Sequence, residues 1–258
     1  TLNNMGDIKR KNVKIGSRVF VRRSNEVIPE ILGLAQELPN SKEIIPPTTC
    51  PCCGGELSEI GANLFCTNVD CQEQIIDSIT HFCSKEAMNI DGLSEKTIKL
   101  LYEKLGLRKI SDIYELKYED LLNLEKFKET KANKLIKSIE NSKNVTISSF
   151  IYALGIKNVG LKTAKDLVKN FKSFEKIKLA SFDELMNVRD IGDIVAESIV
   201  GYFKNEKNLR EIENLFSKGI RLLEEKFEEN EYLSGKKVVF TTGFGQDEVF
   251  RIGSVSCT

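Results

Sequence analysis

The sequence predicts a multidomain α+β protein built from several small modules. Three observations lead to this prediction: alternating apolar and polar residues near the start, two pairs of closely spaced cysteines after them, and a helical repeat of about 32 residues beyond. A chain of 258 residues is long enough to hold this many modules. We expect a partial β-barrel over 1–40, a small cysteine module over 41–73, an all-α repeat over 74–228 and a partial α/β segment over 229–258.

Composition narrows the classes of function. Charged residues make up 29% of the chain, and 38 acidic residues balance 38 basic ones. A net charge of zero argues against a uniformly basic nucleic-acid binder, so any DNA-binding surface must come from local placement of charge. No apolar run is long enough to span a bilayer. The start at Thr1 lacks an initiator Met and a signal-peptide pattern, so we expect a piece cut from a larger cytoplasmic protein.

The first 40 residues favour strands. Residues 15–23 alternate apolar and polar side chains around Val19 and Val21, and residues 27–31 predict a second short strand in which Pro29 indicates an edge or a bulge. Basic residues are frequent here, and basic strand faces of a small barrel can follow a phosphate backbone. We therefore take Arg22 and Arg23 as candidate DNA contacts. The alternative is an ordinary solvated face.

The cysteine module follows a linker with the pair Pro46-Pro47. Cys50 and Cys53 are three residues apart, Cys66 and Cys71 are five apart, and Gly54-Gly55 turns the chain after the first pair. Two such pairs can place four thiolates around one tetrahedral Zn²⁺ ion. Four thiolates leave no open coordination position, so the ion would serve folding rather than catalysis.

Other interpretations of the cysteines remain open at this stage. Two disulfides or four buried thiols are the alternatives, although cytosolic thiols stay reduced. Cys52 lies between two candidate ligands, and the sequence leaves open whether it replaces Cys53. Residues 74–82 have helical spacing, and we expect His81 within them to cap or pack rather than to bind metal.

An internal repeat occupies residues 88 to about 205. Ile156–Gly160 precedes Ala164, and Val188–Gly192 precedes Ala196, so a glycine stands four residues before an alanine in both copies and the copies are 32 residues apart. Two earlier copies without the second glycine are Lys126–Lys128 with Ala132 and Gly92–Ser94 with Ile98. Repeats of this period are one supersecondary unit used several times, here a helix, a tight hairpin and a second helix.

Each hairpin predicts an anion site at the start of its second helix. A glycine there gives the backbone freedom, and the first N–H groups of a helix have no partner within it. Those groups and the helix dipole suit a DNA phosphate without touching base edges, so binding would be independent of sequence. The candidate residues are Gly92, Lys157, Asn158, Gly160, Lys162, Arg189 and Gly192. The alternative is a helical scaffold that binds protein or nothing.

The end of the chain is less regular. Residues 206–233 are predicted to form a charged amphipathic helix and then a linker, with an apolar stripe of Leu209, Ile212, Leu215 and Phe216. Residues 235–243 predict a strand that enters a loop. The remainder is too short to build another domain of normal size.

Taken in this order, the modules resemble the C-terminal half of bacterial NAD-dependent DNA ligase. Residues 1–29 are similar to the end of the family's oligonucleotide-binding (OB) fold, and the four cysteines fall on its zinc finger. Residues 81–93 resemble its junction into a helix-hairpin-helix domain, and residues 233–241 resemble the first strand of its BRCT domain. The resemblance thus implies the end of an OB fold over 1–40, a four-cysteine zinc finger over 41–73, four hairpins over 74–228 and an incomplete BRCT domain over 229–258.

The chain departs from the family pattern at a few places. Asn3 stands where the family usually has His, and Ser24-Asn25 replaces a small Ala-Gly turn. In the BRCT portion, residues 253–256 resemble a later strand, but the helix expected before them is missing.

The resemblance implies a ligase that seals nicks in double-stranded DNA during replication and repair, through a lysine that takes AMP from NAD. That lysine and the NAD site would precede Thr1, so we expect no catalytic residue here and an inactive fragment. One structural Zn²⁺ per chain is expected, with NAD and Mg²⁺ bound outside it. The expected partners are nicked duplex DNA and the N-terminal adenylation domain of the same polypeptide, in the bacterial cytoplasm on the nucleoid. The alternative is a stand-alone DNA-binding adaptor.

Overall fold

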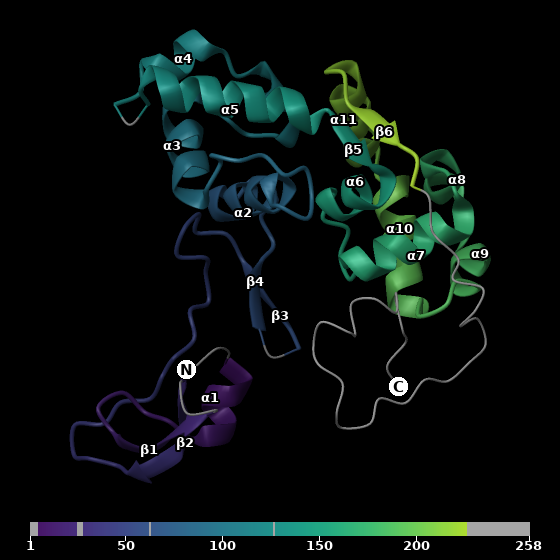
Figure 1. Cartoon of the computed structure of the whole chain (residues 1–258). Coiled ribbons are helices and arrows are strands. Elements are labelled where there is room, and N and C mark those ends of the chain that lie inside the picture. The colour runs from purple at the N-terminus through teal and green to yellow at the C-terminus, as the bar shows by residue number, and fades with distance from the viewer. Residues whose placement is uncertain (1–4, 25–27, 62, 126, 226–258) are drawn as a thin grey trace, which may run out of the picture.

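The computed structural model describes residues 5–24, 28–61, 63–125 and 127–225, and it combines helices with short strands. Figure 1 shows three parts: a small N-terminal unit, a projecting strand hairpin and a curved assembly of helices. Within these residues the strands form three separate pairs, of which two are antiparallel and the third is parallel. The predicted mixture of helices and strands is therefore confirmed.

The N-terminal unit consists of α1 (Met5–Lys11), β1 (Arg18–Ser24) and β2 (Ile28–Gln36). The strands pair antiparallel, with register shifts after Arg18 and after Phe20. Phe20 and Val21 are consecutive residues of β1, and both are more than half exposed, so neither of these side chains is covered within the described residues. A closed barrel therefore stays a prediction. The pattern gave no sign of α1, because this helix buries no residue and so shows no apolar period.

The projecting hairpin consists of β3 (Leu57–Ile60) and β4 (Asn63–Cys66), which pair antiparallel with Leu57 opposite Cys66. The first turn of the module is closed by the N–H of Gly54, which donates to the carbonyl of Cys50 at 2.8 Å. Cys71 then stands at the N-cap of α2 (Gln72–Cys83). The cysteine module is thus continuous with the helical assembly.

The first helical lobe comprises α2, α3 (Glu95–Leu105), the 3₁₀ helix η1 (Ile110–Glu115), α4 (Tyr118–Leu122) and α5 (Glu129–Ser142). Among its α-helices, α3 carries a start signal and a stop signal in its own sequence. Ser94 caps α3 by accepting the N–H of Thr97, and Gly106 ends it with φ 71°, a conformation that suits glycine. The periodic positions Ile98 and Leu101 are fully buried, which explains the docking of this helix in the lobe.

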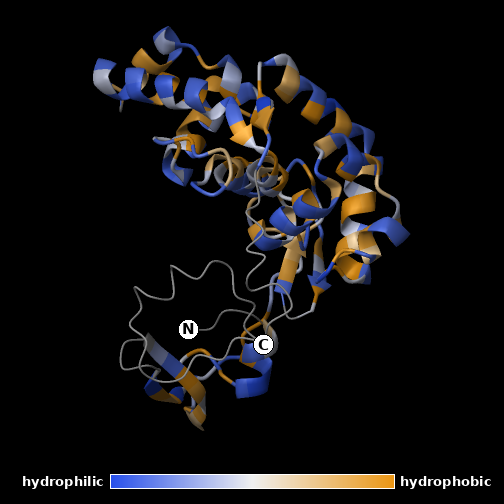
Figure 2. Ribbon diagram, turned by 45° about the vertical axis from the view of Figure 1, so that its right-hand side comes forward, coloured by the Kyte–Doolittle hydropathy of each residue, from blue (hydrophilic) through white to orange (hydrophobic). Residues whose placement is uncertain are grey.

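The second helical lobe holds six α-helices and two short strands. They are β5 (Asn144–Thr146), α6 (Ile147–Ala153), α7 (Leu161–Phe171), α8 (Phe174–Leu179), α9 (Phe182–Met186), α10 (Asp193–Lys204), α11 (Glu206–Ser217) and β6 (Arg221–Leu223). Figure 2 shows how hydrophilic and hydrophobic residues alternate along these helices. That alternation is typical of helices that pack one apolar face against a core.

The region predicted to be all helical contains a parallel strand pair, which corrects that prediction. The last helix ends at Ser217, and Gly219 turns the chain with φ 95°. The chain then pairs β6 with β5, Leu222 lying opposite Val145. Three-residue strands are too short to show an alternating pattern, and parallel pairing joins segments far apart in sequence, so the sequence carried no sign of either.

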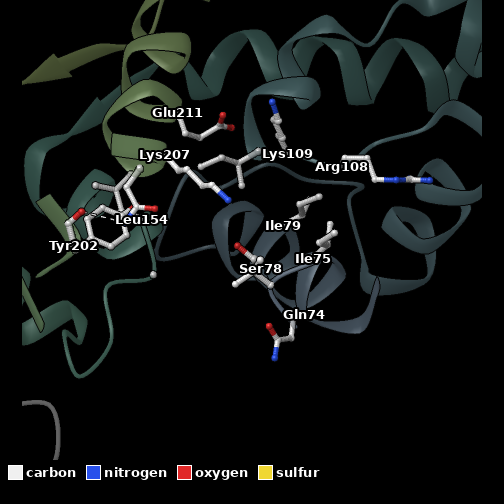
Figure 3. Close-up of a pocket in the computed structure, with 14 residues that line it drawn as sticks. Gln74, Ile75, Ser78, Ile79, Arg108, Lys109, Leu154, Tyr202, Lys207 and Glu211 are labelled. Carbon is white, nitrogen blue, oxygen red and sulfur yellow. Dashed lines mark hydrogen bonds between the residues drawn. The ribbon is translucent and has the colours of Figure 1, made fainter. Parts of the chain in front are cut away.

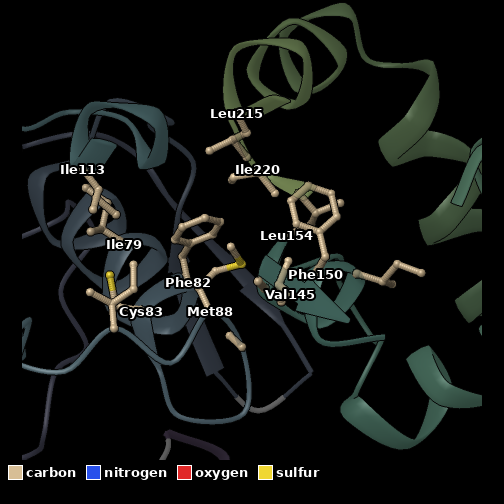
Figure 4. Packing of buried hydrophobic residues seen from close by; sticks show 14 of the residues in the cluster. Ile79, Phe82, Cys83, Met88, Ile113, Val145, Phe150, Leu154, Leu215 and Ile220 are labelled. Atoms are coloured by element: carbon tan, nitrogen blue, oxygen red, sulfur yellow. The ribbon is translucent and has the colours of Figure 1, made fainter. Parts of the chain in front are cut away.

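The two lobes share one hydrophobic core (Figure 4). In the second lobe, the ring of Phe150 lies 5.4 Å from that of Phe174 and 5.5 Å from that of Phe216, and Phe203 completes the group 6.0 Å from Phe174. The Phe150–Phe174 and Phe174–Phe203 pairs meet edge-to-face, and such pairs add about 0.5–1.5 kcal/mol beyond area burial. This core fixes the positions of α6, α8, α10 and α11, and with them the hairpins.

His81 packs between helices, as the sequence predicted. Its ring meets that of Tyr152 edge-on at 4.7 Å, and its Nε2 lies 2.7 Å from the carbonyl oxygen of Tyr152. The side chain thus joins α2 to α6 across the two lobes. Residues 1–4, 25–27 and 226–258 lie outside the described part, and with them the departures at Asn3 and Asn25 and the predicted strand over 235–243. No helix among the described residues is long and apolar enough to cross a membrane.

Candidate metal centre and nucleic-acid interface

The structure gathers four cysteines into one cluster. The sulfur atoms of Cys50, Cys53, Cys66 and Cys71 all lie within 4.8 Å of one another. Two of the distances are 3.9 Å between Cys50 and Cys71 and 3.5 Å between Cys53 and Cys66. A tetrahedron of sulfurs at about 2.3 Å from a zinc ion has edges of about 3.8 Å. The donor set therefore fits a tetrahedral ion, and Cys52 is exposed and outside it.

The backbone around the cluster prepares its thiolates. The N–H of Gly55 donates to the sulfur of Cys53 at 3.4 Å, and this bond, followed by one from the side chain of Asn68, lowers the pKa of Cys53 to about 6. A Cβ at Gly55 would come within 3.2 Å of that sulfur and 3.1 Å of Asn68, so a larger residue would have to displace these neighbours by a few tenths of an ångström. One thiolate is thus available at neutral pH.

A second thiolate in the same cluster needs a cation. The backbone N–H of Gln74 acts to lower the pKa of Cys71, but burial and the neighbouring thiols of Cys53 and Cys50 outweigh it and raise the pKa to about 12. Four thiols this close resist joint ionisation unless a positive ion sits among them. The cluster can therefore hold a soft divalent metal ion.

Two hairpins in the second lobe have the same backbone geometry. In the first, Asn158 has φ 64° and the N–H of Val159 donates to the carbonyl of Ile156. In the second, Asp190 has φ 64° and the N–H of Ile191 donates to the carbonyl of Val188. Each turn leads into a helix, α7 or α10, capped by a glycine. The repeat in the sequence is therefore a repeat of structure.

Gly160 and Gly192 occupy the N-cap positions of α7 and α10, and both are exposed. Neither has a side chain to cap the helix, so the first N–H groups of both helices face outward. Their φ values are −86° and −104°, which any residue can adopt, and a Cβ at either position would meet nothing within 4 Å. Nothing in the described fold requires glycine at these positions.

The buried positions of the hairpins explain the rest of the motif. Val159 and Ile191 are 7% and 6% exposed, and they anchor each turn in the core. Ala164 and Ala196 are fully buried, which permits close approach of the paired helices. The N-termini of α7 and α10 are thus held on rigid elements.

The two earlier hairpins differ from these. Lys128 is an exposed N-cap of α5 without a side-chain cap, and Ala132 is fully buried as in the later copies. In the earliest copy, however, Ser94 caps α3 with its own hydroxyl. Gly92 has φ 95°, a left-handed conformation that favours glycine, so the turn itself explains the glycine at this position. The earliest hairpin is therefore the least open of the four.

Side chains link the two glycine hairpins to each other. The amide of Asn158 donates to the hydroxyl of Ser198 on α10 at 3.1 Å. The ammonium of Lys162 on α7 lies 2.8 Å from the carboxylate of Asp190, whose pKa is lowered by this hydrogen bond. Sequence reasoning missed Ser198 and Asp190, because partners 28 and 40 residues away give no local signal. The remaining candidates of the repeat, Lys157 and Arg189, are exposed in the same two turns.

Arg22 and Arg23 are not brought to the hairpins. Both lie on β1, and the guanidinium of Arg22 pairs across the sheet with Glu30 at 3.1 Å. Figures 1 and 2 both show the N-terminal unit apart from α7 and α10. A joint surface would need a ligand long enough to reach both parts.

An open pocket lies between the lobes (Figure 3). Ile75 and Ile79 of α2 form an apolar wall, and Lys207 extends from α11 toward them. Next to the pocket, the N–H of Ser111 donates to the carboxylate of Glu211, which ties η1 to α11. None of the predicted metal or DNA residues lines this pocket, so it is separate from both candidate sites.

Comparison with known proteins supports this interpretation of the hairpins. A helix-hairpin-helix motif profile matches residues 149–212, which contain both glycine hairpins, and a SAM-like helix-hairpin-helix tandem profile matches residues 84–141. The chain is 51% identical over 247 residues to a DNA ligase of Clostridium botulinum (strain Loch Maree / Type A3), an alignment that covers 94% of this chain and 37% of that protein. The chain is homologous to one segment of the DNA ligases.

Further ligases agree with this assignment. A DNA ligase of Clostridium novyi is 52% identical over 256 residues, with 96% of this chain and 38% of that protein aligned. DNA ligase 2 of Clostridium acetobutylicum is 56% identical over 168 residues, with 64% of this chain and 25% of that protein aligned. The chain thus spans little more than a third of the length of the relatives that it matches most fully.

Proposed function

We propose that this chain is the duplex-holding part of an NAD-dependent DNA ligase that seals nicks in double-stranded DNA during replication and repair. The observation that carries the proposal is the pair of open helix starts at Gly160 and Gly192. Outward N–H groups at a helix start attract anions, and a phosphate is the anion that a DNA backbone repeats. A glycine that the fold does not require is explained by the close approach of another molecule.

The cysteine cluster has a structural role in this proposal. We infer that Cys50, Cys53, Cys66 and Cys71 hold one Zn²⁺, whose binding free energy folds the module between the strands and the helices. The residues around the ion orient the sulfurs and prepare a thiolate at Cys53. The N-terminal unit is inferred to be the end of an OB fold, and residues 229–258 an incomplete BRCT domain.

The sealing chemistry is placed elsewhere. We assign no catalytic residue to this chain. The adenylation lysine, NAD and Mg²⁺ belong, in this proposal, to an N-terminal domain of the same polypeptide, and the fragment alone is inactive. The substrate is nicked duplex DNA in the bacterial cytoplasm, on the nucleoid. A stand-alone adaptor is less favoured, because 94% of the chain aligns with a ligase.

Duplex binding by the zinc-loaded chain tests the proposal. Affinity should be equal for unrelated sequences and should fall with salt, with a slope of log K against log salt of about −0.9 for each phosphate contacted. Metal analysis should find one zinc ion per chain. A folded, zinc-loaded chain without duplex affinity at low salt would refute the proposal.

A further inference from the structure

The two glycine hairpins have the same backbone conformation but differ in the charge of their surfaces. An offset of 32 residues superimposes their sequences, so each position of one has a counterpart in the other. Residues 157–169 carry four lysines against one aspartate, whereas residues 189–201 carry one arginine against three acidic residues. The first hairpin thus presents positive charge and the second presents negative charge.

The difference is sharpest at the helix starts. Lys162 in the first turn of α7 corresponds to Ile194 in the first turn of α10. The side chain of Lys162 is 80% exposed, and Ile194 is 70% exposed. Asp193 occupies the first helical position of α10, where its carboxylate already suits the helix dipole. A phosphate is therefore less favoured at the second helix start than at the first.

We propose that the two hairpins hold a duplex by different chemistry. This inference rests on the proposed function and specifies how the same site works. The hairpin over 156–160 binds phosphates with its amides and Lys162. The hairpin over 188–192 presents Ile194 to the minor groove, where an apolar contact needs no charge. Proteins that bind the minor groove frequently insert apolar side chains there between base steps, isoleucine among them.

The contacts between the hairpins explain why both reach one duplex. Asn158 is bonded to Ser198, and Lys162 to Asp190, so each turn touches the other motif. Ile194 stands four residues before Ser198 within α10, so it lies on the face of that helix from which Ser198 contacts the cationic turn. Gly192, two residues before Ile194, has open space where a Cβ would stand, which leaves room for a groove wall to approach.

Salt dependence separates the two chemistries. Affinity for a fluorescent duplex of mixed sequence would be measured for the zinc-loaded full chain between about 50 and 200 mM salt, the range over which phosphate contacts weaken strongly. Lys162→Ala should reduce the magnitude of the salt slope by about 0.9. Ile194→Ala should lower affinity roughly five-fold at every salt concentration, the effect of losing a partly buried aliphatic side chain, and leave the slope unchanged.

Leu179→Ala is the matched control, because Leu179 is 76% exposed at the end of α8 and outside both hairpins. Its affinity and slope should equal those of the unaltered chain. Unchanged affinity in Ile194→Ala, or a loss that shrinks as salt rises, overturns the inference while the proposed function stands. If the unaltered chain itself does not bind the duplex, the proposed function fails first.

Discussion

Gly160 allows a direct test of whether the open helix starts bind DNA, because stability and binding should respond differently to Gly160→Ala. An added Cβ meets no atom within 4 Å, and φ −86° is ordinary for alanine. Alanine is a poorer N-cap than glycine by about 0.5–1 kcal/mol. Alanine also reduces the conformational entropy of the unfolded chain relative to glycine, which stabilises the fold by about 0.4–1 kcal/mol. The free energy of unfolding should therefore change by about zero.

Binding should change far more. The added methyl group stands where a phosphate would approach the first N–H groups of α7. Hydrogen bonds to charged groups contribute about 1.5–3 kcal/mol each, so displacing one phosphate should weaken duplex binding ten-fold or more. Gly192→Ala should weaken it less, since Asp193 already disfavours a phosphate there.

Gly201→Ala provides the control, because Gly201 lies inside α10 and its Cβ would also meet nothing within 4 Å. Alanine in a helix interior should stabilise the fold by up to about 1 kcal/mol and leave binding unchanged. The assays are urea unfolding and fluorescence anisotropy with a labelled duplex. Equal affinities for Gly160→Ala and the unaltered chain would show that these amides do not hold DNA.

Three further predictions concern the fold around the sites. Cys53→Ser should abolish zinc binding and unfold the cysteine module, as chelation should, whereas Cys52→Ser should leave metal content at one per chain; equal metal content in both variants would remove Cys53 from the ligand set. Glu225→Ala should destabilise the second lobe by about 1–2 kcal/mol in urea unfolding, because the Glu225 carboxylate accepts hydrogen bonds from the N–H and the hydroxyl of Ser148. The control is Glu224→Ala at the exposed neighbouring position, which should leave the free energy of unfolding unchanged. Equal effects of the two substitutions would contradict this role of Glu225. The backbone N–H and hydroxyl of Ser181 lower the pKa of Glu184 in the folded state. The contribution of Glu184 to the free energy of unfolding is therefore present above its ordinary pKa of 4.5 and is lost as pH falls below that value. Glu184→Gln should make the free energy of unfolding less dependent on pH over that range, and an unchanged pH profile would argue against the cap.

Local patterns determined much of this protein. The cysteine spacing identified a candidate metal centre, and the 32-residue repeat located the two open helix starts at Gly160 and Gly192, because turns and caps depend on residues close in sequence. The early repeat copy at Gly92–Ser94 likewise coincides with a helix start, which the structure shows to be capped by Ser94. These features need only a few neighbouring residues to agree.

Only the tertiary structure decided the rest. It placed Cys53 rather than Cys52 in the sulfur cluster, since the direction of a side chain in a tight turn depends on the bonds that Gly55 makes. It paired β5 with β6 and joined Asn158 to Ser198. Such contacts bring together residues that are tens of positions apart, and their geometry is set by the packing of a shared core. No short stretch of sequence contains that information.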